Sequence, residues 1–195
     1  MTQNIYCPQN TQRPQYTIGI DVFKTPLGWF GVLAFDATIS RLRFGLESRE
    51  KAVEALGADQ SFSMINTAQP WQQRLQLYSS GDVVSFADMK LDTDWMSPFQ
   101  KRVIDACRCI PYGSTVTYGQ LAQAAGSPGA ARAVGTVMRN NQFPIIVPCH
   151  RVVAAAGLGG FSAMGGVDTK RRLLEMENAM PAPDHADLFA GRPIF

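Results

Sequence analysis

A cysteine and a histidine stand side by side at Cys149 and His150, after Pro148 and a short apolar run. Cysteine attacks as a thiolate, so it needs a nearby group that accepts its proton. Neighbouring side chains in an extended strand point apart, so His150 could serve only through a turn or a bridging water, and proline favours a turn. The pair suggests nucleophilic thiol chemistry; the alternative is a buried, inert cysteine.

The composition is that of a globular protein that needs no disulfide bonds to fold. The chain has 195 residues, 46% of them hydrophobic, which is enough for one large domain or two small ones. The cysteines lack the spacing of a disulfide framework or of a C-x-x-C motif, and no apolar run approaches the length of a membrane span. We expect a soluble, reduced protein of the cytoplasm, with no metal site and no membrane contact.

Charge is distributed unevenly along the chain. Residues 1–95 carry eight Lys and Arg against ten Asp and Glu, whereas residues 96–195 carry ten against six. The second half, which contains Cys149, therefore has a net charge of +4. This excess permits an anionic partner such as nucleic acid without requiring one.

The first half has the pattern of a small mixed sheet with helices. Three β-rich runs, 16–24, 29–35 and 39–44, are separated by turn residues and predict a meander. Ser48 is the expected N-cap of a helix, a second helix is expected over 69–81, and a further strand over 83–89. A polar segment at 91–100 predicts a domain boundary, with one domain over 1–95.

From residue 96 to 180 the pattern is mainly helical. Ser97 as N-cap and Pro98 at the first position predict a helix with Phe99 and Cys107 on its apolar face. A short helix should end at Gly126, and Ser127 and Pro128 should begin another. This is a helix-turn-helix pattern, and its second helix is rich in Ala and Gly. The predicted fold class is α+β, with a flexible tail over 181–195.

Four segments resemble the O6-alkylguanine-DNA alkyltransferases, also called methylated-DNA-protein-cysteine methyltransferases. They are "YGQLA", "AARAVGTVMRNN", "VPCHRVV" and "GGFSAMGGVDTKRRLLEMEN", and the match extends over about residues 97–178. The segment "KTPLGWFGVLAFDATISRLRFG" is similar to the family's N-terminal domain. The resemblance implies a ribonuclease-H-like first domain and a winged-helix-like second one.

The resemblance also implies a reaction. Cys149 would take a methyl or other alkyl group from O6 of guanine, and from O4 of thymine, in one turnover and without a cofactor. His150 would be the water-linked base and Glu177 the carboxylate that orients it, while Glu175 is out of register. Asn141 would hold the turn before Cys149 through side-chain hydrogen bonds.

The target base must leave the stack to be reached. By resemblance, Arg132 takes its place, Tyr118 lines the pocket and presses on the phosphate, and the slim helix enters the minor groove. The other implied pocket residues are Met138, Val152, Phe161 and Ser162. The other DNA-contact candidates are Ala131, Gly135, Arg139, Arg151, Lys170, Arg171 and Arg172, with a structural role for Arg151 equally open.

The implied partner is double-stranded DNA containing O6-alkylguanine, bound by a monomer near the nucleoid of a bacterium or in a eukaryotic nucleus. Family members with structural zinc use several N-terminal Cys and His residues, but Cys7 stands alone here. In the tail, Leu188 and Phe189 partly match a peptide that docks on sliding clamps. The alternatives are a lesion-binding protein without transfer activity, a helix-turn-helix transcription factor and a cysteine hydrolase.

Overall fold

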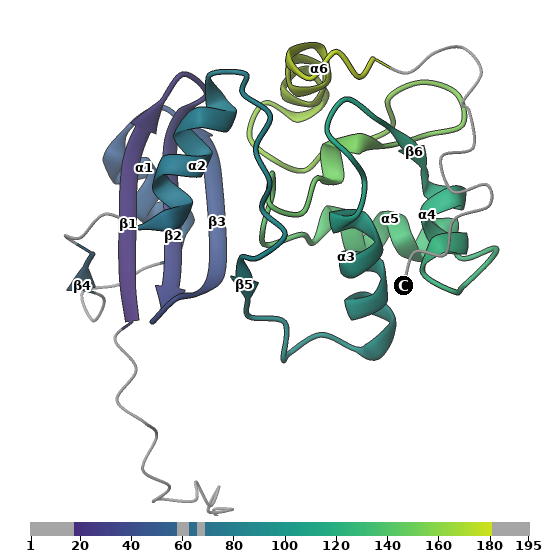
Figure 1. Ribbon diagram of the computed structural model, residues 1–195, viewed down its shortest axis with the longest axis horizontal. Coiled ribbons are helices and arrows are strands. Elements are labelled where there is room, and N and C mark those ends of the chain that lie inside the picture. The colour runs from purple at the N-terminus through teal and green to yellow at the C-terminus, as the bar shows by residue number, and fades with distance from the viewer. Residues whose placement is uncertain (1–17, 58–62, 66–68, 181–195) are drawn as a thin grey trace, which may run out of the picture.

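The computed structural model describes residues 18–57, 63–65 and 69–180 and has the expected α+β fold (Figure 1). Strands β1 (Ile18–Thr25), β2 (Gly28–Phe35) and β3 (Thr38–Leu46) form an antiparallel meander. The short strands β4 (Ser63–Met64) and β5 (Lys90–Leu91) pair in parallel at its two edges, which gives the order β4-β1-β2-β3-β5. The three long strands confirm the predicted meander and a mixed sheet.

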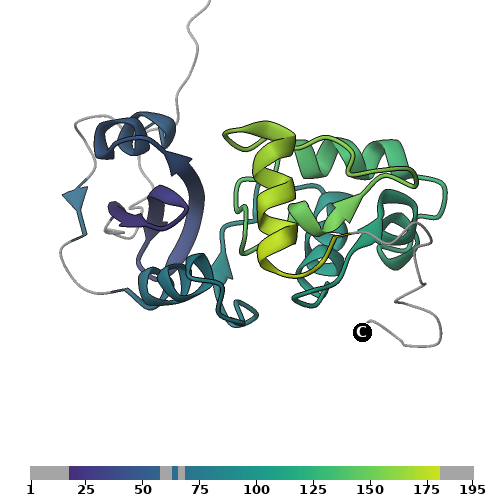
Figure 2. The same ribbon diagram turned by 90° about the horizontal axis from the view of Figure 1, so that it is seen from above.

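Two helices cover opposite faces of this sheet, as the view from above shows (Figure 2). Successive side chains of a strand point to opposite faces. In β2, Leu33 accordingly packs in a cluster with Leu56 at the end of α1 (Arg49–Ala55), whereas Val32 packs on the side of α2 (Pro70–Ser79). Gly31 allows α1 to approach, since a Cβ there would lie 2.9 Å from the Ala52 carbonyl oxygen.

The second half is helical, as predicted. It contains α3 (Pro98–Arg108), α4 (Tyr118–Ala124), α5 (Ala131–Arg139) and α6 (Gly166–Met176), with a parallel pair of short strands, β6 (Val116–Thr117) and β7 (Val152–Val153). Ser97 caps α3 reciprocally with Gln100, which confirms that start. Gly126 follows α4 with a φ of +66°, a conformation that glycine adopts without strain. The helix-turn-helix is therefore α4 and α5.

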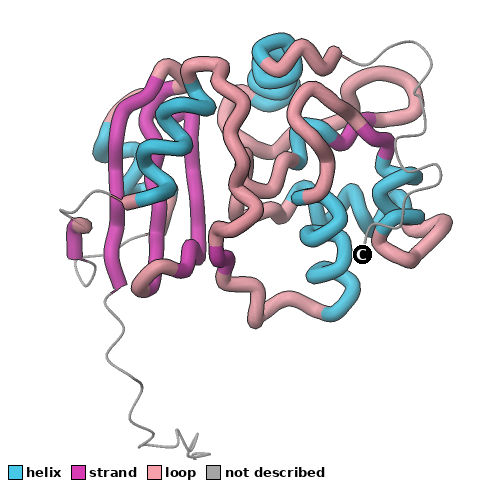
Figure 3. The backbone as a smooth tube through the Cα atoms, in the orientation of Figure 1, coloured by secondary structure: helices cyan, strands magenta, loops and turns pink. Residues whose placement is uncertain are grey.

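Two local predictions were wrong. Helix α5 begins at Ala131, because Gly129 has a φ of +84° and breaks the helical path, so Ser127 and Pro128 lie in the turn before it. Residues 83–89 form an irregular connection rather than a strand (Figure 3). Three of their carbonyl groups accept from one side chain, since Arg108 donates to the oxygens of residues 86, 87 and 89.

The two halves share one core. A single cluster of buried apolar side chains extends from Phe23 and Trp71 to Val137 and Cys149. The backbone N–H of Leu42 in β3 donates to the Gln142 carbonyl at 2.8 Å, and Arg43 donates to the Gln142 side chain at 2.6 Å. The sheet edge thus supports the segment that leads to Cys149. None of the helices in the described parts of the chain could span a membrane, being too short or too polar.

Candidate active site

Cys149 lies at the end of a tight turn held by Asn141. The Asn141 amide donates to the Val147 carbonyl at 2.9 Å, and its oxygen accepts the Phe143 N–H at 2.9 Å. Between these bonds Ile145 has a φ of +74°, which is strained for a β-branched residue. The turn then enters a short 3-10 helix, Cys149–Arg151. Side-chain bonds therefore keep a strained backbone in the shape that presents Cys149.

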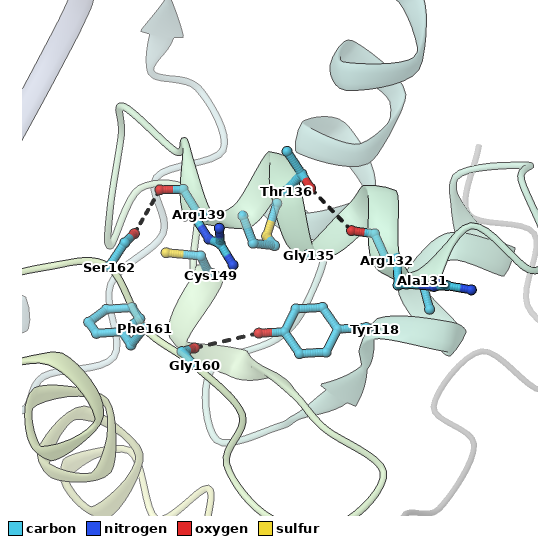
Figure 4. A pocket seen from close by; sticks show the side chains of 11 residues that line it. Tyr118, Ala131, Arg132, Gly135, Thr136, Arg139, Cys149, Gly160, Phe161 and Ser162 are labelled. Carbon is cyan, nitrogen blue, oxygen red and sulfur yellow. Dashed lines mark hydrogen bonds between the residues drawn. The ribbon is translucent and has the colours of Figure 1, made fainter.

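A cavity of about 640 Å³ opens beside the thiol (Figure 4). Helix α5 forms one side of it, and Tyr118 with the segment 160–162 forms the other. Ser162 donates to the Arg139 carbonyl at 2.8 Å and so joins the two sides. Its volume lies in the range of small-molecule sites. The lining residues are Tyr118, Ala131, Arg132, Gly135, Thr136, Met138, Arg139, Cys149, Gly160, Phe161 and Ser162.

A buried network of hydrogen bonds lies behind Cys149. His150 is 0% exposed, and its Nε2 is 2.8 Å from Oε1 of Glu177, which ends α6 and is 2% exposed. Arg151 donates to both oxygens of the same carboxylate, at 2.8 and 3.0 Å. Glu175 is exposed. An ionised carboxylate only accepts, so Nε2 of His150 must carry the proton and Nδ1 is the free acceptor.

The pKa values of these groups set the resting protonation state of the site. Burial raises the pKa of Cys149, although a hydrogen bond from Asn141 and the charge of Lys170 act against it. Burial lowers the pKa of His150 despite the nearby Glu177 carboxylate. Burial alone would raise the pKa of Glu177, but hydrogen bonds from His150 and Arg151 lower it to about 2. At neutral pH the site therefore contains a thiol, a neutral imidazole and a carboxylate.

Two expected phosphate contacts need correction. Lys170 is 0% exposed, and its Nζ donates to the carbonyl oxygens of Val152 and Gly160, at 2.6 and 3.3 Å. Burial lowers the pKa of Lys170 to about 8. Arg151 is held by Glu177 and by the Ile110 carbonyl, at 2.7 Å. Neither cation could reach a phosphate without giving up these bonds, whereas Arg132, Arg139, Arg171 and Arg172 are exposed.

Some site residues differ from the expected set. Val152 is buried and does not line the cavity, and its carbonyl accepts a hydrogen bond from Lys170. Thr136 and Gly160 line the cavity but were not predicted, although both lie within the quoted motifs. Tyr78 of α2 contacts Glu177 and His150, and no pattern in the sequence indicates this.

No cluster of three or more Cys, His, Asp or Glu side chains that could hold a metal ion occurs in the described part of the chain. Cys7 and the tail residues Leu188 and Phe189 lie outside the described residues.

Comparison with known proteins gives a consistent result. Residues 98–179 match the family model "6-O-methylguanine DNA methyltransferase, DNA binding domain". The methylated-DNA--protein-cysteine methyltransferase of Mycobacterium bovis is 46% identical over 117 residues, which cover 60% of this chain and 68% of that protein. The enzyme of the same name from Methanopyrus kandleri is 46% identical over 108 residues, covering 55% of this chain and 79% of its own.

The likeness extends to the fold of both halves. A crystal structure of Mycobacterium tuberculosis OGT in complex with DNA superposes with a TM-score of 0.67 and 35% identity, covering 87% of this chain and 97% of its own. The O6-methylguanine-DNA methyltransferase of Pyrococcus kodakaraensis superposes with a TM-score of 0.65 and 29% identity, and the match covers 81% of this chain and 98% of that chain. With these relatives, and with a cysteine, a histidine and a glutamate arranged beside a helix-turn-helix, this chain belongs to the methylated-DNA-protein-cysteine methyltransferase family.

Proposed function

We propose that this protein repairs DNA by moving a methyl or other alkyl group from O6 of guanine to Sγ of Cys149, once per molecule. The observation that carries the proposal is the position of Cys149. Its thiol lines a cavity beside the second helix of a helix-turn-helix, and it is followed directly by a histidine hydrogen-bonded to a buried carboxylate. O4 of thymine offers similar chemistry and is the expected second substrate.

The reaction begins with loss of the thiol proton. Nδ1 of His150 is buried and has no hydrogen-bond partner among the described protein atoms. A buried acceptor without a partner is costly, so Nδ1 is suited to bind a water that links it to Sγ. The proton passes through that water to His150, and the Nε2–H bond to Glu177 stabilises the imidazolium that forms.

The thiolate then attacks the alkyl carbon in line with the C–O6 bond. The S–C bond forms as the C–O6 bond breaks, and the electron pair goes to guanine. The leaving guanine needs a proton or a hydrogen-bond donor to neutralise its charge. Burial raises the pKa of Tyr118, so its hydroxyl stays protonated at neutral pH and is suited to donate from the cavity wall. The S-alkylcysteine product is a stable thioether, which ends activity after one event.

Helix α5 is suited to bind the duplex in the minor groove. Its residues Ala131, Gly135 and Thr136 are small and not buried, and Arg132 lies beside them and also lines the cavity. We propose that Arg132 fills the stack when the target nucleotide rotates into the cavity, and that Arg139 contacts phosphate. The protein would act as a monomer on chromosomal DNA. We also propose that Leu188 and Phe189 contact a sliding clamp.

Intact-protein mass spectrometry tests the function. The protein is incubated with duplex DNA containing one O6-methylguanine, and the adduct is located by peptide mapping. A gain of one methyl group on Cys149, stopping at one per molecule, is the expected result. Cys149→Ala should gain none, and the matched control Cys109→Ser, at an exposed cysteine, should react like the wild type. Lesion binding without any mass gain would instead indicate a recognition protein without transfer activity.

A further inference from the structure

Tyr78 brings a hydroxyl from the first half of the chain into the network behind Cys149. It lies near the end of α2 and is 0% exposed. Its O–H is 2.6 Å from Oε1 of Glu177, and its oxygen is 3.2 Å from Nε2 of His150. These partners are 99 and 72 positions away in the sequence. A buried tyrosine hydroxyl needs a partner, and here both partners belong to the proposed proton relay.

The number of available protons shows which of the two partners accepts the hydrogen bond from Tyr78. Tyr78 has one proton and can donate it either to Glu177 or to Nε2 of His150. If it donated to Nε2, the imidazole proton would sit on Nδ1, and His150 could not accept a proton from Cys149. The shorter distance is to Glu177, whose carboxylate accepts from Tyr78, His150 and Arg151. Donation to Glu177 leaves Nε2 as a donor and Nδ1 as the acceptor.

We propose that Tyr78 is a positioning residue for alkyl transfer, which holds Glu177 as an acceptor and thereby keeps His150 in the tautomer that can deprotonate Cys149. The inference rests on the proposed function and deepens it. Under it, the first half of the protein contributes to the chemistry as well as to the fold.

A change in the pH dependence of transfer separates this role from simple packing. His150 is faced by Glu177 from the end of α6, by Lys170 within α6, by its neighbours Cys149 and Arg151, and by Tyr78 from α2. In Tyr78→Phe the first four groups remain. The carboxylate loses one donor, so it stabilises protonated His150 more strongly, and the pKa of His150 rises. The imidazole then stays charged, and unable to act as a base, up to a higher pH.

The test is single-turnover methyl transfer by Tyr78→Phe across about pH 5 to 9, with DNA concentration varied at each pH. We expect the rate of methyl transfer at saturating DNA to fall by about tenfold near neutral pH. This decrease is smaller than the rate enhancement of about 100-fold or more that a general base provides, because His150 itself remains. The acidic limb of the profile should move to higher pH, and the DNA concentration for half-maximal rate should not change.

Tyr112→Phe is the matched control. Tyr112 packs edge-on against Tyr78 with ring centroids 6.3 Å apart, and its hydroxyl donates to the carbonyls of Gly81 and Met176 rather than to the relay. Its pH profile should match that of the wild type. An unshifted profile with an unchanged saturating rate in folded Tyr78→Phe overturns the inference, as does an equal shift in both variants.

A second measurement works even if Tyr78→Phe does not fold. The chain has two histidines, His150 and His185, so ¹⁵N spectra of the wild-type imidazoles are simple to assign with a His185→Asn variant. We expect neutral His150 to carry its proton on Nε2; a proton on Nδ1 overturns the inference. If wild-type protein takes no methyl group from DNA, the proposed function fails, whereas the tautomer of His150 still tests the direction of the Tyr78 hydrogen bond on which the inference depends.

Discussion

Arg151 binds Glu177 through two hydrogen bonds, Nε to Oε2 at 2.8 Å and Nη2 to Oε1 at 3.0 Å, in a region from which water is almost excluded. Removing one partner of a buried pair leaves the other charge uncompensated. We therefore expect Arg151→Met to lower the free energy of unfolding by about 3–5 kcal/mol, measured by urea denaturation.

The exposed Arg139 provides the comparison for that prediction. Arg139→Met should change the free energy of unfolding by less than about 0.5 kcal/mol, as is usual at the surface. If instead Arg151→Met were as stable as the wild type and had lost salt-dependent DNA affinity, Arg151 would be a phosphate contact after all.

The carboxylate of Glu177 should make stability depend on acid. Its pKa is about 2 in the folded protein, below the ordinary value of 4.5. The unfolded chain thus binds this proton first as pH falls, so the stabilisation is complete above about pH 4.5 and is lost on the way to about pH 2. The loss should amount to a few kcal/mol. Urea denaturation as a function of pH measures it.

Glu177→Gln should flatten this part of the stability curve and lower stability at neutral pH, because Arg151 loses its counter-ion. Glu175→Gln, two positions away and exposed, should keep the wild-type curve. Identical curves for both variants and the wild type would mean that the acid sensitivity arises at other carboxylates.

Asn141→Ala removes both side-chain hydrogen bonds that hold the turn before Cys149. The positive φ of Ile145 is then poorly supported. We expect a loss of about 1–3 kcal/mol in stability and slower methyl transfer at saturating DNA. Asn140→Ala, at the exposed neighbour that ends α5, should retain the wild-type transfer rate. Full activity in Asn141→Ala would show that the backbone alone maintains the turn.

DNA binding and chemistry should be separable. Cys149→Ala is expected to bind lesion-containing duplex as tightly as the wild type and to transfer nothing. Arg132→Ala should weaken binding of the flipped state by about 1–3 kcal/mol, the typical contribution of a side chain stacked against bases. Fluorescence of a base analogue beside the lesion reports flipping, and anisotropy reports binding. Arg49→Ala, at an exposed arginine of α1, should affect neither; an equal loss there would indicate a general charge effect.

Much of the fold follows from local signals. The three strands of the meander were predicted from β-rich runs between turn residues, and α3 was predicted from Ser97 and Pro98. The errors occur where a distant or conformational factor overrides composition. Residues 83–89 have the composition of a strand, but Arg108 donates hydrogen bonds to the carbonyls of residues 86 and 87. The positive φ of Gly129 prevents α5 from beginning before Ala131.

The sequence by itself determined the adjacent Cys149 and His150 and the helix-turn-helix, because these depend on residue type and short spacing, and the resemblance to the family implied most of the cavity lining. Only the tertiary structure decided the environment of the charges. It buries Arg151 and Lys170, which the sequence alone allowed at the surface, and it brings Tyr78 to a carboxylate 99 positions away. Burial and long-range hydrogen bonds depend on which segments pack together, and a local pattern contains no information about that packing.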